Sequence, residues 1–191
     1  VCLSFAHVAA WLSPGKEAKA ADVSGITTVE ALQDGVAGAV SSDSDTTLTL
    51  GGNIAADYTA EGGLLTLPEQ LTHKLTIDLN GFTLRVDTSG DCACLDVAKG
   101  VELVVKNGTL AGSSNGSFAF VQSEANVTLE DVKIEFDGAD QTDSYVVWSN
   151  GYCTFDNVQI NATGVKEYVN SYPNNVTYAT LQDEINAATP G

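Results

Sequence analysis

The chain has 191 residues, of which 43% are hydrophobic, so it can bury one sizeable core. It carries 25 acidic and 8 basic residues, for a formal net charge of −17 at pH 7. A chain this acidic lacks the basic footprint of a nucleic-acid-binding protein and is repelled by anionic membranes and acidic polymers. Its 18 Gly, together with recurrent Thr, Val, Asn and Asp, are typical of short strands joined by tight turns.

The first apolar run, VCLSFAHVAAWL, is too short to span a bilayer. The tripeptide Ala18-Lys19-Ala20 follows it and fits a small-x-small cleavage signal before Ala21. The pattern predicts a signal peptide remnant over residues 1–20. It therefore predicts a secreted or cell-surface protein with no membrane span in its mature chain. An ordinary N-terminal helix is the alternative interpretation.

The next segment has a helical pattern. Apolar residues recur at helical spacing over residues 28–40, namely Val29, Leu32, Val36 and Val40. Thr27 and Glu30 have the spacing of a capping box. We therefore expect an amphipathic helix over residues 28–40. It would cover the exposed end of the strands that follow, because an open strand edge invites aggregation.

A repeat of about two dozen residues dominates the middle of the chain. Its copies are LTIDLNGFTL (75–84), VELVVKNGTL (101–110), VTLEDVKI (127–134) and CTFDNVQI (153–160). Their final apolar residues are separated by 26, 24 and 26 positions: Leu84, Leu110, Ile134 and Ile160. A fixed period of this length indicates a stack of coils, and one coil of a parallel β-helix, with three short strands and their turns, is about that long.

Alternation within the repeat predicts which residues face the core. The strands that open the copies are predicted to place one inner row along Ile77, Leu103, Leu129 and Phe155. Each copy also has a bend residue that tolerates a left-handed backbone: Asn80, Asn107, Asp131 and Asn157. We expect these side chains to form a ladder whose amide groups bond to neighbouring coils.

These motifs carry a family resemblance. IDLNGFTL, followed by V-x-N-G-T-L and L-x-D-V-x-I, resembles secreted bacterial proteins of the right-handed parallel β-helix, pectate-lyase-like superfamily, in particular its cell-surface and adhesin-like members. The resemblance covers about residues 26–163 and is unspecific for activity. The predicted fold is all-β: a single-stranded right-handed parallel β-helix over residues 21–163, with an N-terminal amphipathic cap helix over residues 28–40.

The tail of the chain repeats its head. TYATLQDEINAAT (177–189) matches TVEALQDGVAGAV (28–40) at a Leu-Gln-Asp triplet and at the apolar pair Val36 and Ile185. If the first copy opens a β-helix, the second opens another. We therefore predict a linker over residues 164–176 and the truncated start of a second similar repeat over residues 177–191. Chance similarity is the alternative.

The superfamily also contains enzymes, and their chemistry has no counterpart here. The resemblance implies calcium-binding Asp clusters with a basic residue for its lyases, and converging carboxylates with His and Arg-x-Lys for its glycosidases. After residue 20 the chain has one His, His73, and one Arg, Arg85. Neither joins an Asp pair at matching positions on successive coils, so no catalytic residue is predicted.

Three cysteines lie in the predicted β-helix. Cys92, Cys94 and Cys153 have no nearby His or second Cys pair, which makes a zinc site a poor interpretation. We expect free thiols that pack as small hydrophobic groups, and the sequence leaves their disulfide state open.

Two segments could bind ligands. FDGADQTD clusters Asp137, Asp140 and Asp143 in a loop, and carboxylates suit Ca²⁺, the one cofactor that the sequence suggests. A solvated acidic loop is the alternative. The third strands, CACLDV, FAFVQS and YVVWSN, would by strict alternation expose an aromatic ledge for a sugar or a partner surface, formed by Phe118, Phe120 and Tyr145 with Gln122 and Ser149. A break in alternation at a corner would instead bury these residues.

The function that these patterns favour is structural. We expect a non-catalytic module of a secreted bacterial surface protein, acting as a stalk or adhesin with a glycan or a host or bacterial surface protein as partner, and not with nucleic acid. The alternative is a polysaccharide-active enzyme, a lyase or glycoside hydrolase, whose catalytic residues lie outside this fragment.

Overall fold

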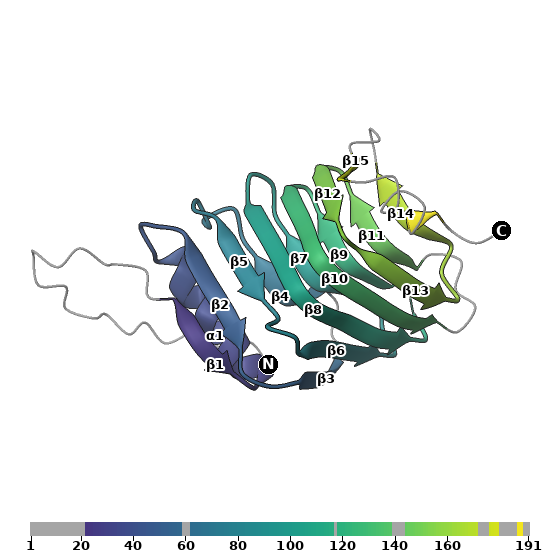
Figure 1. The fold of residues 1–191 in the computed structure, drawn as a ribbon, viewed down its shortest axis with the longest axis horizontal. Helices are drawn as coiled ribbons and strands as arrows, with labels where there is room; N and C mark the ends of the chain where they lie inside the picture. The colour runs from purple at the N-terminus through teal and green to yellow at the C-terminus, as the bar shows by residue number, and fades with distance from the viewer. Residues whose placement is uncertain are drawn as a thin grey trace, which may run out of the picture.

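The computed structural model describes residues 22–58, 62–116, 118–138, 144–171, 176–179 and 187–188. They form a parallel β-solenoid of about five turns, in which successive coils lie side by side (Figure 1). The predicted fold, a single-stranded parallel β-helix with one helix near its N-terminus, is confirmed. The predicted signal peptide over residues 1–20 lies outside the described residues.

Each coil supplies three strand segments after the opening strand β1 (Val23–Ile26) and helix α1 (Val29–Val40). The first segments are β2 (Thr46–Leu50), β5 (Leu75–Asp78), the first halves of β8 (Glu102–Ser114) and β10 (Asn126–Gly138), β12 (Tyr152–Asp156) and β15 (Val176–Tyr178). The second segments are β3 (Ile54–Tyr58), β6 (Thr83–Thr88), the second halves of β8 and β10, and β13 (Gln159–Thr163). The third segments are β4 (Gly62–Leu67), β7 (Cys92–Val97), β9 (Phe118–Ser123), β11 (Tyr145–Ser149) and β14 (Glu167–Ser171).

These segments pair into two parallel sheets. The first and second segments, together with β1, form a ten-stranded sheet, and the third segments form a five-stranded sheet in the order β14-β11-β9-β7-β4. The pairing continues past residue 163, because β14 pairs with β11 and β15 pairs with β12. Residues 167–171, within the predicted linker, are therefore part of the stack. The start of a second repeat over residues 177–191 stays a prediction.

Helix α1 packs against the first coil through one apolar face, as predicted. Leu32 and Val36 are buried in the common core. Gly35 allows the close approach, because a Cβ there would meet Leu48 Cδ2 at 2.9 Å. The helix begins one residue later than a Thr27 cap would place it. Thr28 is the N-cap, and its hydroxyl accepts a hydrogen bond from the Ala31 N–H at 3.2 Å.

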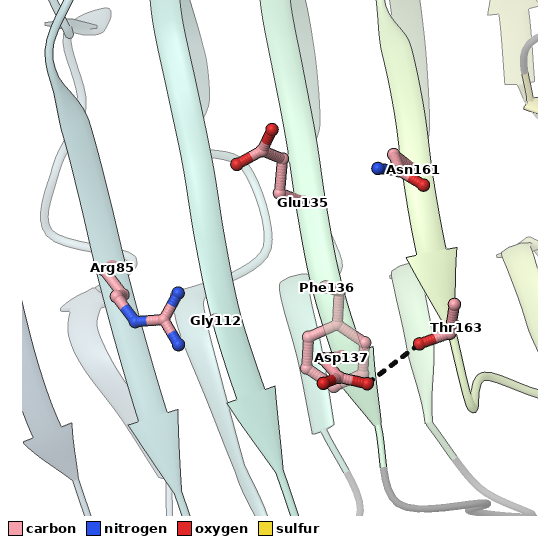
Figure 2. Close-up of a pocket in the computed structure, with 7 residues that line it drawn as sticks. All are labelled: Arg85, Gly112, Glu135, Phe136, Asp137, Asn161 and Thr163. Carbon is pink, nitrogen blue, oxygen red and sulfur yellow. Dashed lines mark hydrogen bonds between the residues drawn. The ribbon is translucent and has the colours of Figure 1, made fainter.

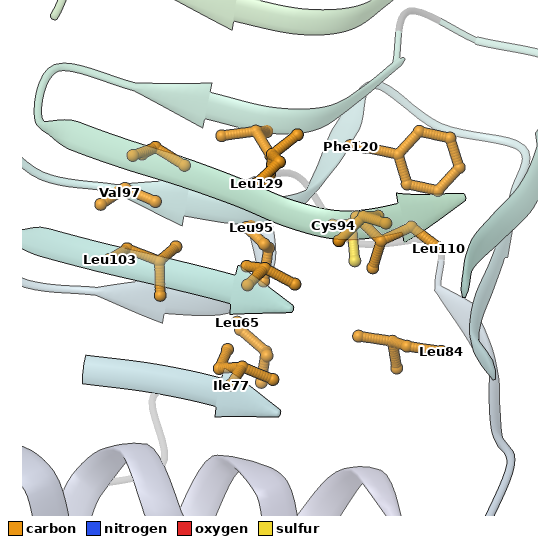
Figure 3. Packing of buried hydrophobic residues seen from close by; sticks show 14 of the residues in the cluster. Leu65, Ile77, Leu84, Cys94, Leu95, Val97, Leu103, Leu110, Phe120 and Leu129 are labelled. Carbon is orange, nitrogen blue, oxygen red and sulfur yellow. The ribbon is translucent and has the colours of Figure 1, made fainter. Parts of the chain in front are cut away.

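The core is one continuous cluster that runs through all coils. Figure 3 shows part of it. The repeat alignment is confirmed at the final apolar residues, since the strand registers pair Leu84, Leu110, Ile134 and Ile160 in succession. The predicted inner row is wrong at one residue, Leu103. The observed row runs through Leu48, Ile77, Val105, Leu129 and Phe155, all fully buried.

The bend of one coil explains the shift of Leu103. Asp78 pairs with Lys106 and Thr83 pairs with Thr109, so residues 79–82 on one coil lie opposite residues 107–108 on the next. The bend after β5 therefore holds two residues more than the bend within β8. Aligning the coils by their final residues displaces the first strand by two positions. A shift of two keeps the same face inward, so Leu103 remains fully buried, in the row of Leu75.

The bends have the predicted backbone conformation. The non-glycine residues with positive φ in the described parts of the chain are Asn80, Asn107, Asp131 and Asn157, with φ from 52° to 58°. Each Asn amide donates a hydrogen bond to the preceding coil. Asn80 Nδ2 reaches the Leu50 carbonyl at 3.1 Å, Asn107 reaches Asp78 Oδ1 at 3.2 Å, and Asn157 reaches Asp131 Oδ1. The sharp bends thus also link the coils.

Candidate functional site

The predicted aromatic ledge does not form on the third strands. Phe120 and Val147 are fully buried, and Ser149 is 1% exposed. Phe120 packs edge-on against Phe136, with ring centroids 5.6 Å apart. The side chains of Phe118 and Gln122 lie outside the described residues. Tyr145 is half-buried, and the Lys166 ammonium stands 5.8 Å from its ring centroid. The expectation that Phe120 and Ser149 face outward is therefore wrong.

A corner in each third strand causes this difference. Two consecutive residues are buried there on four of the five coils: Leu64 and Leu65, Cys94 and Leu95, Phe120 and Val121, Val146 and Val147. The register skips one residue at the same place, because Ala119 pairs with Tyr145 and the next pair is Val121 with Val147. The chain turns between the two residues, and both side chains then point into the core. Strict alternation holds for a straight strand and fails at such a corner.

The three described cysteines, Cys92, Cys94 and Cys153, are free and buried. Burial raises the pKa of Cys94 and of Cys153 to about 12. Burial also raises the pKa of Cys92. A thiol with so high a pKa has almost no thiolate at neutral pH and is a poor nucleophile or metal ligand. These residues serve as small apolar side chains.

The predicted calcium loop is described only at one of its three carboxylates. Asp140 and Asp143 lie outside the described residues. Asp137 is exposed and accepts a hydrogen bond from the Thr163 hydroxyl at 3.0 Å. The described residues contain no group of three or more His, Cys, Asp or Glu that could hold a metal ion. Calcium binding by the three residues together stays a prediction.

The candidate functional site is an open groove on the outer face of the ten-stranded sheet (Figure 2). Its volume is about 540 Å³. Its polar lining comes from different coils: Arg85 from β6, Glu135 and Asp137 from β10, and Asn161 and Thr163 from β13. The parallel register explains why they meet. Glu135 pairs with Asn161 and Asp137 pairs with Thr163, so side chains of equal position in successive coils form rows across the strands.

The floor of the groove is made by two residues without polar side chains, Gly112 and Phe136. Gly112 pairs with Val86 on one side and with Phe136 on the other. A Cβ at Gly112 would meet the Val86 carbonyl oxygen at 2.2 Å, so only glycine fits between these strands. Arg85 and Asp137 lie on either side of β8, as Figure 2 shows. The residues of β8 in their rows have small side chains, because Arg85 pairs with Ala111 and Asp137 pairs with Ser113.

Ion pairs and hydrogen bonds hold the polar side chains in place. The Arg85 guanidinium contacts Asp87 through Nε–Oδ2 at 2.7 Å and Nη2–Oδ1 at 2.8 Å. The Ser113 hydroxyl donates to Asp87 Oδ1 at 2.7 Å. Burial raises the pKa of Asp87, but the hydrogen bonds from Arg85 and Ser113 outweigh it and leave the pKa below its ordinary value. Lys133 pairs with Glu135 on the same strand.

The groove presents fixed acceptors and donors to a polar ligand. Glu135 and Asp137 supply carboxylate oxygens, and Asn161 and Arg85 supply N–H donors. The sequence pattern indicates Asp137 as a calcium ligand and Arg85 only as the lone arginine, and it does not indicate the other lining residues. The 26-residue spacing that joins Glu135 to Asn161 and Asp137 to Thr163 was the available signal, because it is also the spacing of the coils.

Comparisons with family models, with curated proteins and with solved structures found no match. Among the described residues, no helix has the length and apolar character needed to cross a membrane.

Proposed function

We propose that this chain is a non-catalytic module of a secreted bacterial surface protein, working as a stalk or adhesin. The support for a stalk is the continuous core. Each coil buries its apolar side chains against the next, so the stack behaves as one stiff unit that can display a face away from a surface. The support for an adhesive role is the open polar groove on the side of the stack, on the outer face of the ten-stranded sheet.

The observation that carries the proposal is the groove on the ten-stranded sheet. It is open and polar, and its hydrogen-bonding groups repeat at the coil spacing of about 4.8 Å. A hydroxyl-rich glycan offers both donors and acceptors, and it would meet Glu135, Asp137 and Asn161 in one region. A net charge of −17 disfavours acidic glycans and leaves neutral or cationic ones. Individual contacts of this kind are weak, and multivalency makes such contacts effective.

A glycan array probed with the full chain tests the proposal. We expect binding to a subset of neutral or amino-sugar glycans. Asn161→Ala and Arg85→Ala should each weaken that binding by about tenfold or more, as the loss of one or two hydrogen bonds implies. Asn150→Ala is the matched control, because Asn150 is exposed on the turn after β11 and does not line the groove. Circular dichroism should show that every variant folds.

Two outcomes would count against this function. Glycan binding that survives both groove substitutions would place the adhesive site elsewhere, and no binding to any glycan would remove the adhesive role. Incubation with the bound glycan provides the second check. Release of shortened oligosaccharides would support the polysaccharide-active enzyme in place of the stalk or adhesin.

A further inference from the structure

A second hollow lies on the five-stranded sheet, away from the groove. Its volume is about 260 Å³, and its walls include Asp96, Glu124 and Trp148. Each wall comes from a different coil: Asp96 from β7, Glu124 from the turn after β9, and Trp148 from β11. Sites for drug-sized ligands measure about 300–1,000 Å³, so this hollow has the size for one side chain or head group.

The register fixes how far apart the walls stand. Asp96 pairs with Gln122 and Gln122 pairs with Trp148, so Asp96 and Trp148 occupy the same row two coils apart. At about 4.8 Å per coil, their Cα atoms are about 10 Å apart. Gln122 lies between them in that row, so a ligand of the hollow would lie over the Gln122 strand, against the walls that Asp96, Glu124 and Trp148 supply.

Among the described residues, the ion pairs involve neither Asp96 nor Glu124. The Glu124 N–H donates to the Val97 carbonyl at 3.0 Å, which holds Glu124 beside the coil of Asp96. Two carboxylates and a half-buried tryptophan therefore line one hollow, and none of its described lining residues is basic.

An aromatic ring with adjacent carboxylates is the recognition chemistry of an organic cation. A cation over an indole face is attracted by the ring quadrupole, and more strongly when it is shielded from water. The chain already uses this contact on the same strand, where Lys166 stands over the ring of Tyr145. At Trp148 the ring and the carboxylates are in place, and the described residues place no cation in the hollow.

We propose that this hollow binds the guanidinium or ammonium group of a basic side chain from a partner polypeptide, between the Trp148 indole and the carboxylates of Asp96 and Glu124. The small volume takes the head group, and the rest of the partner lies outside on the sheet. The net charge of −17 draws basic polypeptides toward the surface before the contact forms. This site does not depend on the groove, which lies on the other sheet.

Tryptophan fluorescence of the full chain tests the site. The chain has two Trp, so Trp11→Phe leaves Trp148 as the only indole. The probes are acetyl-Gly-Arg-Gly-amide, its citrulline counterpart, which has nearly the same shape without the charge, and methylguanidine. We expect the arginine peptide to change the Trp148 emission in a saturable way at low salt. The citrulline peptide should bind at least tenfold more weakly.

Substitutions then assign the binding to the hollow. The double variant Asp96→Asn with Glu124→Gln should weaken arginine-peptide binding at least tenfold, while Asp156→Asn should leave it unchanged. Asp156 is an exposed acid at the end of β12, on the other sheet. Calorimetry on Trp148→Leu should show a comparable loss.

Three results would overturn the proposal. Equal binding of the citrulline peptide would show that charge is not recognised. An equal loss of arginine-peptide binding in Asp156→Asn would show that the binding depends only on the net negative charge of the chain. Methylguanidine binding as tightly as the peptide would assign the site to free cations and not to a polypeptide partner.

Discussion

The surroundings of Asp96 in the folded protein disfavour its ionised carboxylate. Burial raises its pKa, and the nearby charge of Glu124 raises it further. A carboxyl whose pKa is higher in the folded state than in the unfolded chain destabilises the fold once it ionises. That loss is absent below the ordinary pKa and is complete above the raised one.

Asp96→Asn should therefore raise the melting temperature at neutral pH, and the gain should vanish as the pH falls below about 3.9, the ordinary Asp pKa. Thermal melts of both proteins across the acidic range measure this difference. Asp156→Asn is the control and should show no comparable gain. A gain for Asp96→Asn that persists at the lowest pH would mean that the charge of Asp96 is not its cause.

The role of a single residue could be predicted where its local backbone conformation restricts the residue type, and not where the role depends on the three-dimensional arrangement of the coils. The bend residues could be predicted because a left-handed backbone restricts the residue type strongly, and Asn80, Asn107, Asp131 and Asn157 all adopt it. The orientation of Phe120 could not be predicted, since it depends on a corner that no residue type marks. The groove residues were missed for a similar reason, because Glu135 and Asn161 become neighbours only through the register of the coils.

At the scale of one element, the bend within β8 has a measurable energetic role. Asn107 has φ 58° and donates to Asp78 on the preceding coil. Asn107→Ala should lower the free energy of unfolding by about 1–3 kcal/mol. The backbone of an alanine is strained in the left-handed region, and the hydrogen bond from the Asn107 side chain is lost. Asn107→Gly should cost less, because glycine adopts this conformation freely.

Urea denaturation of both variants provides the comparison. Asn126→Ala is the matched control, since Asn126 is exposed and lies outside the left-handed region. It should change stability by less than about 0.5 kcal/mol, as surface substitutions usually do. Finding Asn107→Ala and Asn107→Gly equally stable would show that backbone conformation does not govern this bend.

The elements differ in how clearly the sequence marks them. Helix α1 and the first two strands of each coil follow regular periods, so residues 28–40 and the repeat copies could be located closely. The third strands break the period of two at their corners, where Cys94 and Leu95 are buried together. The two extra residues in the bend after β5 displaced one row, because an alignment without gaps cannot show an insertion.

On the scale of the whole molecule, the continuous core implies that a destabilising substitution in one coil lowers the stability of the entire stack. Leu103 is fully buried between Leu75 and Val127 of the neighbouring coils. Leu103→Ala should lower the free energy of unfolding by about 2–5 kcal/mol through the cavity that it leaves. Val104→Ala is the control, because Val104 is next in the strand and faces outward.

Equilibrium unfolding in urea tests this prediction. Both variants should unfold in a single transition, with the midpoint of Leu103→Ala well below that of Val104→Ala. A loss below about 1 kcal/mol for Leu103→Ala, outside the range for a buried leucine, would contradict the core assignment. Two separate transitions would contradict a single cooperative stack.

The architecture was far easier to predict than the function. A period near 26 residues and alternating apolar positions specify stacked parallel coils, whatever the coils do. Binding surfaces arise from residues that share a row across several coils, such as Arg85, Glu135 and Asn161, and a row carries no motif in the linear sequence. The groove is formed only where neighbouring coils lie side by side.

The hydrogen bonds that involve side chains give the stack of coils a direction. Asn107 donates to Asp78, Ser113 donates to Asp87, and Thr163 donates to Asp137, so in each case the later coil provides the hydrogen and the earlier coil the oxygen. The same order holds for the backbone N–H groups that reach Asp45 and Asn53 from the following coil. In a chain synthesised from its N-terminus, each new coil therefore meets acceptors that are already in place. Some of the acidic side chains that give the protein its negative charge thus also accept the hydrogen bonds that fix the next coil in place.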